Sequence, residues 1–171
     1  MLYGATISEE CKNDNHLPAK REEIMKLSWA NDWSVGNRFV DYAHKELLGI
    51  INQIVRSVVA GDVAALSEAF QLLEESLCAY FVVEENIAQA LNFDFTQHRR
   101  EHQNLLNKFR YIRDELMDKN GKWSKFEGKC YVASLRHCLI KHVKEDSKPL
   151  KIMLETNFYN FNPVRVNNAP V

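Results

Sequence analysis

The feature that most constrains the fold is a repeat of apolar residues at alternating spacings of four and three. Residues at these spacings lie on one face of an α-helix, which repeats every ~3.6 residues. Four stretches of the chain carry such a stripe, which is typical of the inward faces of packed helices. The four stripes are Leu48, Ile51, Val55, Val58; Leu66, Phe70, Leu73, Leu77; Leu105, Phe109, Ile112, Leu116; and Leu135, Leu139.

These stripes predict four long helices joined by short turns, over residues 39–60, 63–91, 96–119 and 124–148. Gly61 is expected to end the first helix. Thr96 and Ser124 are expected to cap the third and fourth. Pro149 is expected to end the fourth, because proline disrupts a helix interior. Helices of similar length with short connections favour an all-α, up-down-up-down four-helix bundle.

The chain divides into three predicted regions. Residues 1–25 are polar and form an N-terminal extension, residues 26–154 form the bundle, and residues 155–171 form an irregular C-terminal tail. Trp29 and Trp33 precede the first helix and are expected to pack as a lead-in segment at one end of the bundle.

Composition excludes several classes of function. The chain has 171 residues, of which 46% are hydrophobic. Its formal net charge is -1, so it lacks the excess of basic residues expected of a nucleic-acid-binding protein. It lacks an apolar run of the ~18–20 residues that cross a membrane, and no signal peptide is evident near Met1. The four cysteines form no C-x-x-C pair. We therefore expect free thiols and a cytoplasmic location.

Polar side chains occupy positions on the stripes where apolar residues are expected. They are His44, Tyr80, Glu84, His98, His102, His142 and Asp146, and each predicted helix contributes at least one. Burying an unpaired polar group costs roughly 2–7 kcal/mol, which a shared metal would offset. Imidazole and carboxylate groups suit iron, with manganese or zinc as alternatives. Any single pair could instead be an exposed i,i+4 pair, and a lone histidine could be a hydrogen-bonded core residue.

The motifs around these residues resemble those of the hemerythrin family, specifically the small bacterial hemerythrins. The resemblance covers about residues 27–150 and rests on Leu27-Ser28-Trp29, Trp33 to Gly36, Asp41 to Leu48, Ile51-Asn52, Phe81 to Glu85, His98-x3-His102 and His142 to Asp146. It implies a four-helix bundle with a non-haem di-iron centre that binds O2 at one iron. By position, His98, His102 and His142 would hold one iron, His44 and Tyr80 would hold the other, and Glu84 and Asp146 would bridge them.

Two residues depart from the family pattern. The family usually has histidine at the position of Tyr80, on the iron that receives O2. Tyr80 could bind iron as a phenolate, stay protonated and donate to a bound species, or leave that site weak or empty, with one metal or none. The family also spaces its last histidine and aspartate five apart, whereas His142 and Asp146 are four apart. A local shift in the helix register would account for the shorter spacing, as would participation of Glu145 in the site.

Three functions follow from this reading. The leading hypothesis is a hemerythrin-like non-haem iron protein that binds O2 or a related small molecule for storage, delivery or sensing. The second is a di-iron oxidase or an enzyme that handles peroxide, suggested by Tyr80 beside a redox metal. The third is an interaction module that has lost one iron. A binding protein is favoured over an enzyme, and the sequence leaves the oligomeric state open.

Overall fold

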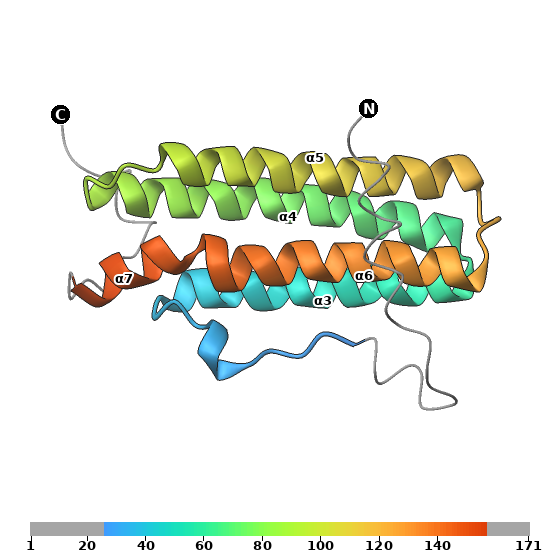
Figure 1. The fold of residues 1–171 in the computed structure, drawn as a ribbon, viewed down its shortest axis with the longest axis horizontal. Helices are drawn as coiled ribbons and strands as arrows, with labels where there is room; N and C mark the ends of the chain where they lie inside the picture. The colour runs from blue at the N-terminus through green and yellow to red at the C-terminus, as the bar shows by residue number, and fades with distance from the viewer. Residues whose placement is uncertain (1–25, 157–171) are drawn as a thin grey trace.

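The structure is a computed structural model, in which residues 26–156 are described. The predicted extension (1–25) and nearly all of the predicted tail lie outside the described residues. The described residues form four long helices, and each runs antiparallel to the one before it in the chain (Figure 1). They are α3 (Arg38–Ala60), α4 (Val63–Ala90), α5 (Thr96–Lys119) and α6 (Lys125–Lys141). Residues 26–156 contain no strand. The predicted all-α four-helix bundle is confirmed.

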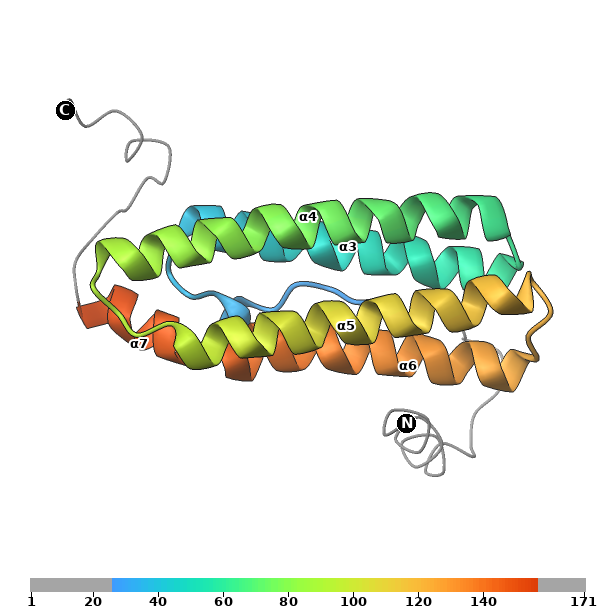
Figure 2. The same cartoon turned by 90° about the horizontal axis from the view of Figure 1, so that it is seen from above.

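The helices pack as two layers, which Figure 2 shows from above. α3 packs against α4 and α6, and α5 packs against α4 and α6. Each helix therefore has two neighbours, and the four inward faces meet along one axis. This arrangement brings the polar stripe positions of different helices to a shared interior.

Side chains and backbone geometry fix the helix ends much as the sequence predicts. Gly61 adopts the left-handed conformation (φ 68°) that ends α3. Ser124 and Glu127 form a reciprocal capping box at the start of α6. The expected cap by Thr96 is wrong, because Thr96 is already helical and the α5 cap position makes no side-chain hydrogen bond. Asp94 instead accepts a hydrogen bond from the Thr96 backbone nitrogen (3.0 Å).

The fourth predicted helix is interrupted. α6 ends at Lys141, a π turn η3 (His142–Asp146) follows, and a short helix α7 (Lys148–Thr156) continues to the end of the described residues. The expectation that Pro149 ends a helix is therefore wrong. Pro149 is the second residue of α7, where its missing N–H has no helical partner to lose.

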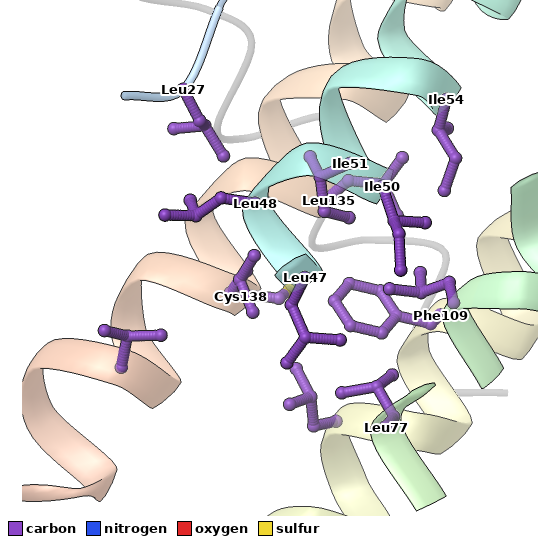
Figure 3. Close-up of a cluster of buried hydrophobic side chains, with 14 of the residues drawn as sticks. Leu27, Leu47, Leu48, Ile50, Ile51, Ile54, Leu77, Phe109, Leu135 and Cys138 are labelled. Carbon is purple, nitrogen blue, oxygen red and sulfur yellow. The ribbon is translucent and has the colours of Figure 1, made fainter. Parts of the chain in front are cut away.

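The apolar stripes fill the interior. Buried side chains from all four long helices form one hydrophobic cluster. In Figure 3, Leu47, Leu77 and Phe109 point toward one another from α3, α4 and α5. Because this apolar core surrounds the bundle axis, any polar group placed on the axis is removed from water.

The segment before α3 packs against the bundle, as its two tryptophans predict. Trp29 and Trp33 are partly buried against the core, with their ring centroids 6.1 Å apart. Asn52 on α3 holds this segment through the backbone of Leu27. Its side chain accepts from Leu27 N (2.7 Å) and donates to Leu27 O (2.8 Å), and both residues are buried.

The cysteines depart in part from the expectation of free thiols. Cys78 is free and Cys138 forms no disulfide. The expectation is wrong for Cys130, which is disulfide-bonded. Cys11 lies outside the described residues. Within residues 26–156, no helix combines the length and apolar content that crossing a membrane requires.

Candidate metal centre

Four buried side chains converge inside the bundle. Glu84, His98, His102 and His142 each offer one metal-ligand atom, and these four atoms lie within 4.8 Å of one another. They come from α4, α5 and η3. None is more than 5% exposed. The group therefore unites residues far apart in sequence, on helices that pack side by side.

Glu84 is the centre of this group. One carboxylate oxygen, Oε2, lies 3.0 Å from His98 Nε2 and 2.9 Å from His102 Nε2. The other oxygen, Oε1, is buried and has no hydrogen-bond partner. Burial disfavours the ionised carboxyl, but hydrogen bonds from His102 and His98 outweigh burial and hold the pKa of Glu84 well below its usual range. Glu84 is therefore an anion.

The three imidazoles of the group differ in their proton affinity. Burial lowers the pKa of His142 well below its usual value, and burial also lowers the pKa of His102. Burial acts in the same direction on His98, but the Glu84 carboxylate outweighs it and raises the pKa of His98. His102 and His142 are thus neutral at pH 7, with nitrogen lone pairs available to a metal.

Contacts around the histidines orient their rings. His98 Nδ1 lies 3.4 Å from Glu101 Oε2, so its Nε2 faces Glu84. Phe81 stacks on His102 with ring centroids 3.8 Å apart and an interplanar angle of 11°. Phe95 packs against the two histidines of α5, with ring centroids 4.6 Å from His98 and 5.5 Å from His102. Apolar rings around the nitrogen donors exclude water and limit ring rotation.

His44 and Tyr80 lie beside the group. His44 Nε2 is 2.7 Å from the Tyr80 hydroxyl, and His142 Nε2 is 3.2 Å from the same hydroxyl. His44 is 0% exposed and Tyr80 is 2% exposed. Burial, followed by the charge of Glu84, raises the pKa of Tyr80 well above its usual value. The hydroxyl is therefore protonated, and it can donate one hydrogen bond and accept another.

The structure does not bring the Asp146 carboxylate into the group. Its side chain is half-buried on η3 and pairs with Lys141, while its Oδ2 lies 4.0 Å from His142 Nδ1. Glu145 is exposed. The buried side chain after the π turn belongs to Ser147, which is 0% exposed and donates to His142 O at 3.1 Å.

Sequence reasoning missed Ser147. It interacts with Tyr80 through a side-chain hydrogen bond that opposes the rise of the tyrosine pKa. The signal that could have found it is its place five residues after His142, the spacing at which the family carries its aspartate. Thus, of the seven residues singled out from sequence, four converge, His44 and Tyr80 lie next to them, and Asp146 points elsewhere.

The donor atoms suit a metal ion. Besides Glu84 Oε1, the Nδ1 atoms of His44, His102 and His142 are buried without hydrogen-bond partners among the described residues. Such unsatisfied groups are expensive in a core, at roughly 1–3 kcal/mol each. Three nitrogens and one carboxylate oxygen are a donor set for iron, manganese or zinc.

Comparisons with known proteins find weak similarity to several bacteriohemerythrins. The chain is 23% identical over 137 residues to a bacteriohemerythrin of Pseudomonas aeruginosa, a match spanning 71% of this chain and 90% of that protein. The bacteriohemerythrin of Pseudomonas paraeruginosa matches over the same lengths at the same identity. That of Aquifex aeolicus is 27% identical over 92 residues, covering 53% of this chain and 65% of that protein. No protein-family model and no solved structure matches the chain.

Proposed function

We propose that this chain, a weak homologue of several bacteriohemerythrins, is a hemerythrin-like protein that holds one iron ion through Glu84, His98, His102 and His142. The observation that carries the proposal is the convergence of these four buried donors within 4.8 Å. Such a site is costly to keep without a ligand, because its carboxylate and imidazoles are removed from water.

The residues would perform distinct tasks at this site. Glu84 supplies the anionic oxygen, and the three imidazoles supply nitrogen donors. Phe81 and Phe95 shield the site, since they pack on His102 and His98. The resemblance to the hemerythrin family favours iron over manganese or zinc. A bound iron ion would supply a redox-active Lewis acid able to take a small ligand such as O2.

Tyr80 would act on such a ligand as a hydrogen-bond donor. Its hydroxyl is protonated and buried, and it lies 3.2 Å from Nε2 of His142, one of the four donors. A hydrogen-bond donor removed from water stabilises a small polar or anionic ligand. We therefore propose binding of O2 or a related small molecule, for sensing or storage, as the function of the site.

A second candidate is a di-iron centre in which Tyr80 and His44 hold the second metal. It is favoured by the 2.7 Å contact between two fully buried donors next to the first group. In that case Tyr80 would bind as a phenolate, a hard anionic ligand that favours ferric iron. The two candidates differ in the number of metals per chain and in the ionisation of Tyr80.

Elemental analysis separates these candidates. Protein produced with iron and purified without chelator should contain about one iron per chain, and His102→Ala should lose it. About two irons, with a visible phenolate band that disappears in Tyr80→Phe, would support the di-iron alternative. Wild-type protein that folds fully and retains no metal after anaerobic loading would refute both candidates.

His137→Ala is the matched control for His102→Ala. His137 is an exposed histidine on α6, so its removal should leave the metal content unchanged. Equal losses from both variants would mean that iron binds at the surface. For ligand binding, the anaerobic ferrous protein should change its optical spectrum on exposure to O2. An unchanged spectrum in protein with a full iron complement would reject O2 as the ligand.

A further inference from the structure

Two residues beside the proposed iron site, His44 and Tyr80, are not among its four donors. His44 is fully buried, its Nδ1 has no hydrogen-bond partner among the described residues, and its Nε2 contacts the Tyr80 hydroxyl. A fully buried imidazole that makes one hydrogen bond and leaves its other nitrogen unpaired is expensive to keep. His44 therefore indicates a second polar position in the bundle.

The Tyr80 hydroxyl occupies this position. It lies between two imidazole nitrogens, 2.7 Å from His44 Nε2 and 3.2 Å from His142 Nε2. Ser147 and the Glu84 carboxylate also interact with it. Glu84 has one oxygen, Oε1, without a partner. The atoms around the hydroxyl are thus the donor types that a second metal would need, contributed by α3, α4, η3 and the residue after η3.

Charge explains why a neutral hydroxyl suits this position. Glu84 is the one carboxylate in the group of metal-ligand atoms, and Asp146 is paired with Lys141 instead. Two divalent ions beside a single carboxylate would leave a net charge of about +3 in a buried site, which is strongly unfavourable. With one ion, the net charge is about +1. Ser147, which is also fully buried, adds a hydroxyl and no charge.

We infer that Tyr80 and Ser147 close a second metal position next to His44 and Glu84, and so limit the site to one metal per chain. The inference rests on the proposed one-iron function. Histidine at position 80 would be shorter than tyrosine and would offer a nitrogen from the same helix face. Aspartate at position 147 would add the missing negative charge. The double variant Tyr80→His/Ser147→Asp should therefore hold two metals.

The test is metal content after identical anaerobic loading with Fe²⁺ and gel filtration. We expect about one iron per chain for wild type and Tyr80→Phe, and about two for Tyr80→His/Ser147→Asp, with magnetic coupling between the two ions. Tyr80→His alone should bind the second equivalent at least tenfold more weakly than the double variant. One iron in the folded double variant would overturn the inference.

Tyr131→His is the matched control, because it makes the same substitution at a buried tyrosine of α6 whose hydroxyl contacts Glu115 (3.2 Å). It should stay at one iron, and a second iron there would overturn the inference by showing that any added histidine recruits metal. Circular dichroism checks folding. If the double variant does not fold, a Zn²⁺ titration of Tyr80→His decides. We expect a second equivalent that wild type lacks and that binds at least tenfold more weakly than the first, and a Tyr80→His protein that binds Zn²⁺ just as wild type does overturns the inference.

The wild-type protein separates this inference from the proposed function. No metal in wild type would refute the one-iron site, whatever the variants bind. One metal in wild type and one in the folded double variant would leave the proposed function standing and reject the role of Tyr80 and Ser147. Two metals in wild type would reject both.

Discussion

Replacing Asn52 with alanine tests how the segment before α3 is held on the bundle. The Asn52 amide accepts from Leu27 N at 2.7 Å and donates to Leu27 O at 2.8 Å. Both residues are buried, so alanine leaves a backbone donor and a backbone acceptor without partners. A buried hydrogen bond is worth about 1 kcal/mol net, and an unsatisfied group costs about 1–3 kcal/mol. We expect the free energy of unfolding to fall by about 2–4 kcal/mol.

A second estimate bounds this value. If the segment leaves the bundle to hydrate its backbone, the burial of Leu27 is lost, at about 2 kcal/mol for a leucine side chain. Both routes therefore predict a loss of about 2 kcal/mol or more. For a chain of this size, where 1 kcal/mol shifts Tm by roughly 2–4 °C, Tm should fall by about 4–16 °C.

Urea denaturation, followed by circular dichroism and tryptophan fluorescence, measures this loss. Trp29 lies two residues from Leu27 and reports on the segment itself. Gln53→Ala is the control, because Gln53 is the exposed neighbour on the same helix and should change stability by less than about 0.5 kcal/mol. An Asn52→Ala protein as stable as the control would refute the reasoning. Metal content should be unchanged, since Asn52 is not among the metal-group residues.

Three further predictions concern the ends and lining of the helices. Ser124→Ala removes the side-chain cap of α6 and should cost about 1 kcal/mol in a denaturant titration. The Lys119 ammonium and the Ser124 backbone lower the pKa of Glu127 from 4.5 to about 2. Its stabilisation is therefore present above pH 4.5 and lost as the pH falls toward 2, so Glu127→Gln should flatten the acid dependence of Tm in that range. Phe81→Ala removes the ring stacked on His102 and should cost about 3–5 kcal/mol and weaken metal binding, as thermal melts and chelator competition would show.

The sequence predicts the helices and their inward faces well, because burial and the 3.6-residue period act over many turns. Leu66, Leu77 and Leu116, for example, are all 0% exposed, as their stripes require. Ser124 was predictable as a cap because glutamate follows three residues later. The expected cap at Thr96 failed because Asp94, two residues earlier, accepts the hydrogen bond from the Thr96 backbone nitrogen instead.

The end of α6 shows where pattern reasoning stops. A spacing of four places His142 and Asp146 on one α-helical face, but the π turn widens the helix locally and changes the face that each residue presents. The spacing of apolar residues along a helix does not reveal where a single turn is widened into a π turn. Consequently Ser147, rather than Asp146, is buried in the interior. The convergence of Glu84, His98, His102 and His142 survives because each lies on a regular helix or at its edge.

The π turn also has a consequence for how this protein could change over evolution. Asp146 immediately precedes Ser147, so the acid and the buried position are one residue apart along the chain. Insertion of a single codon between His142 and Asp146 would carry the aspartate into the interior and move the serine beyond it. The same insertion would separate Asp146 from Lys141, its present partner. The charge of the bundle interior thus depends on the number of residues in the π turn as well as on their identity.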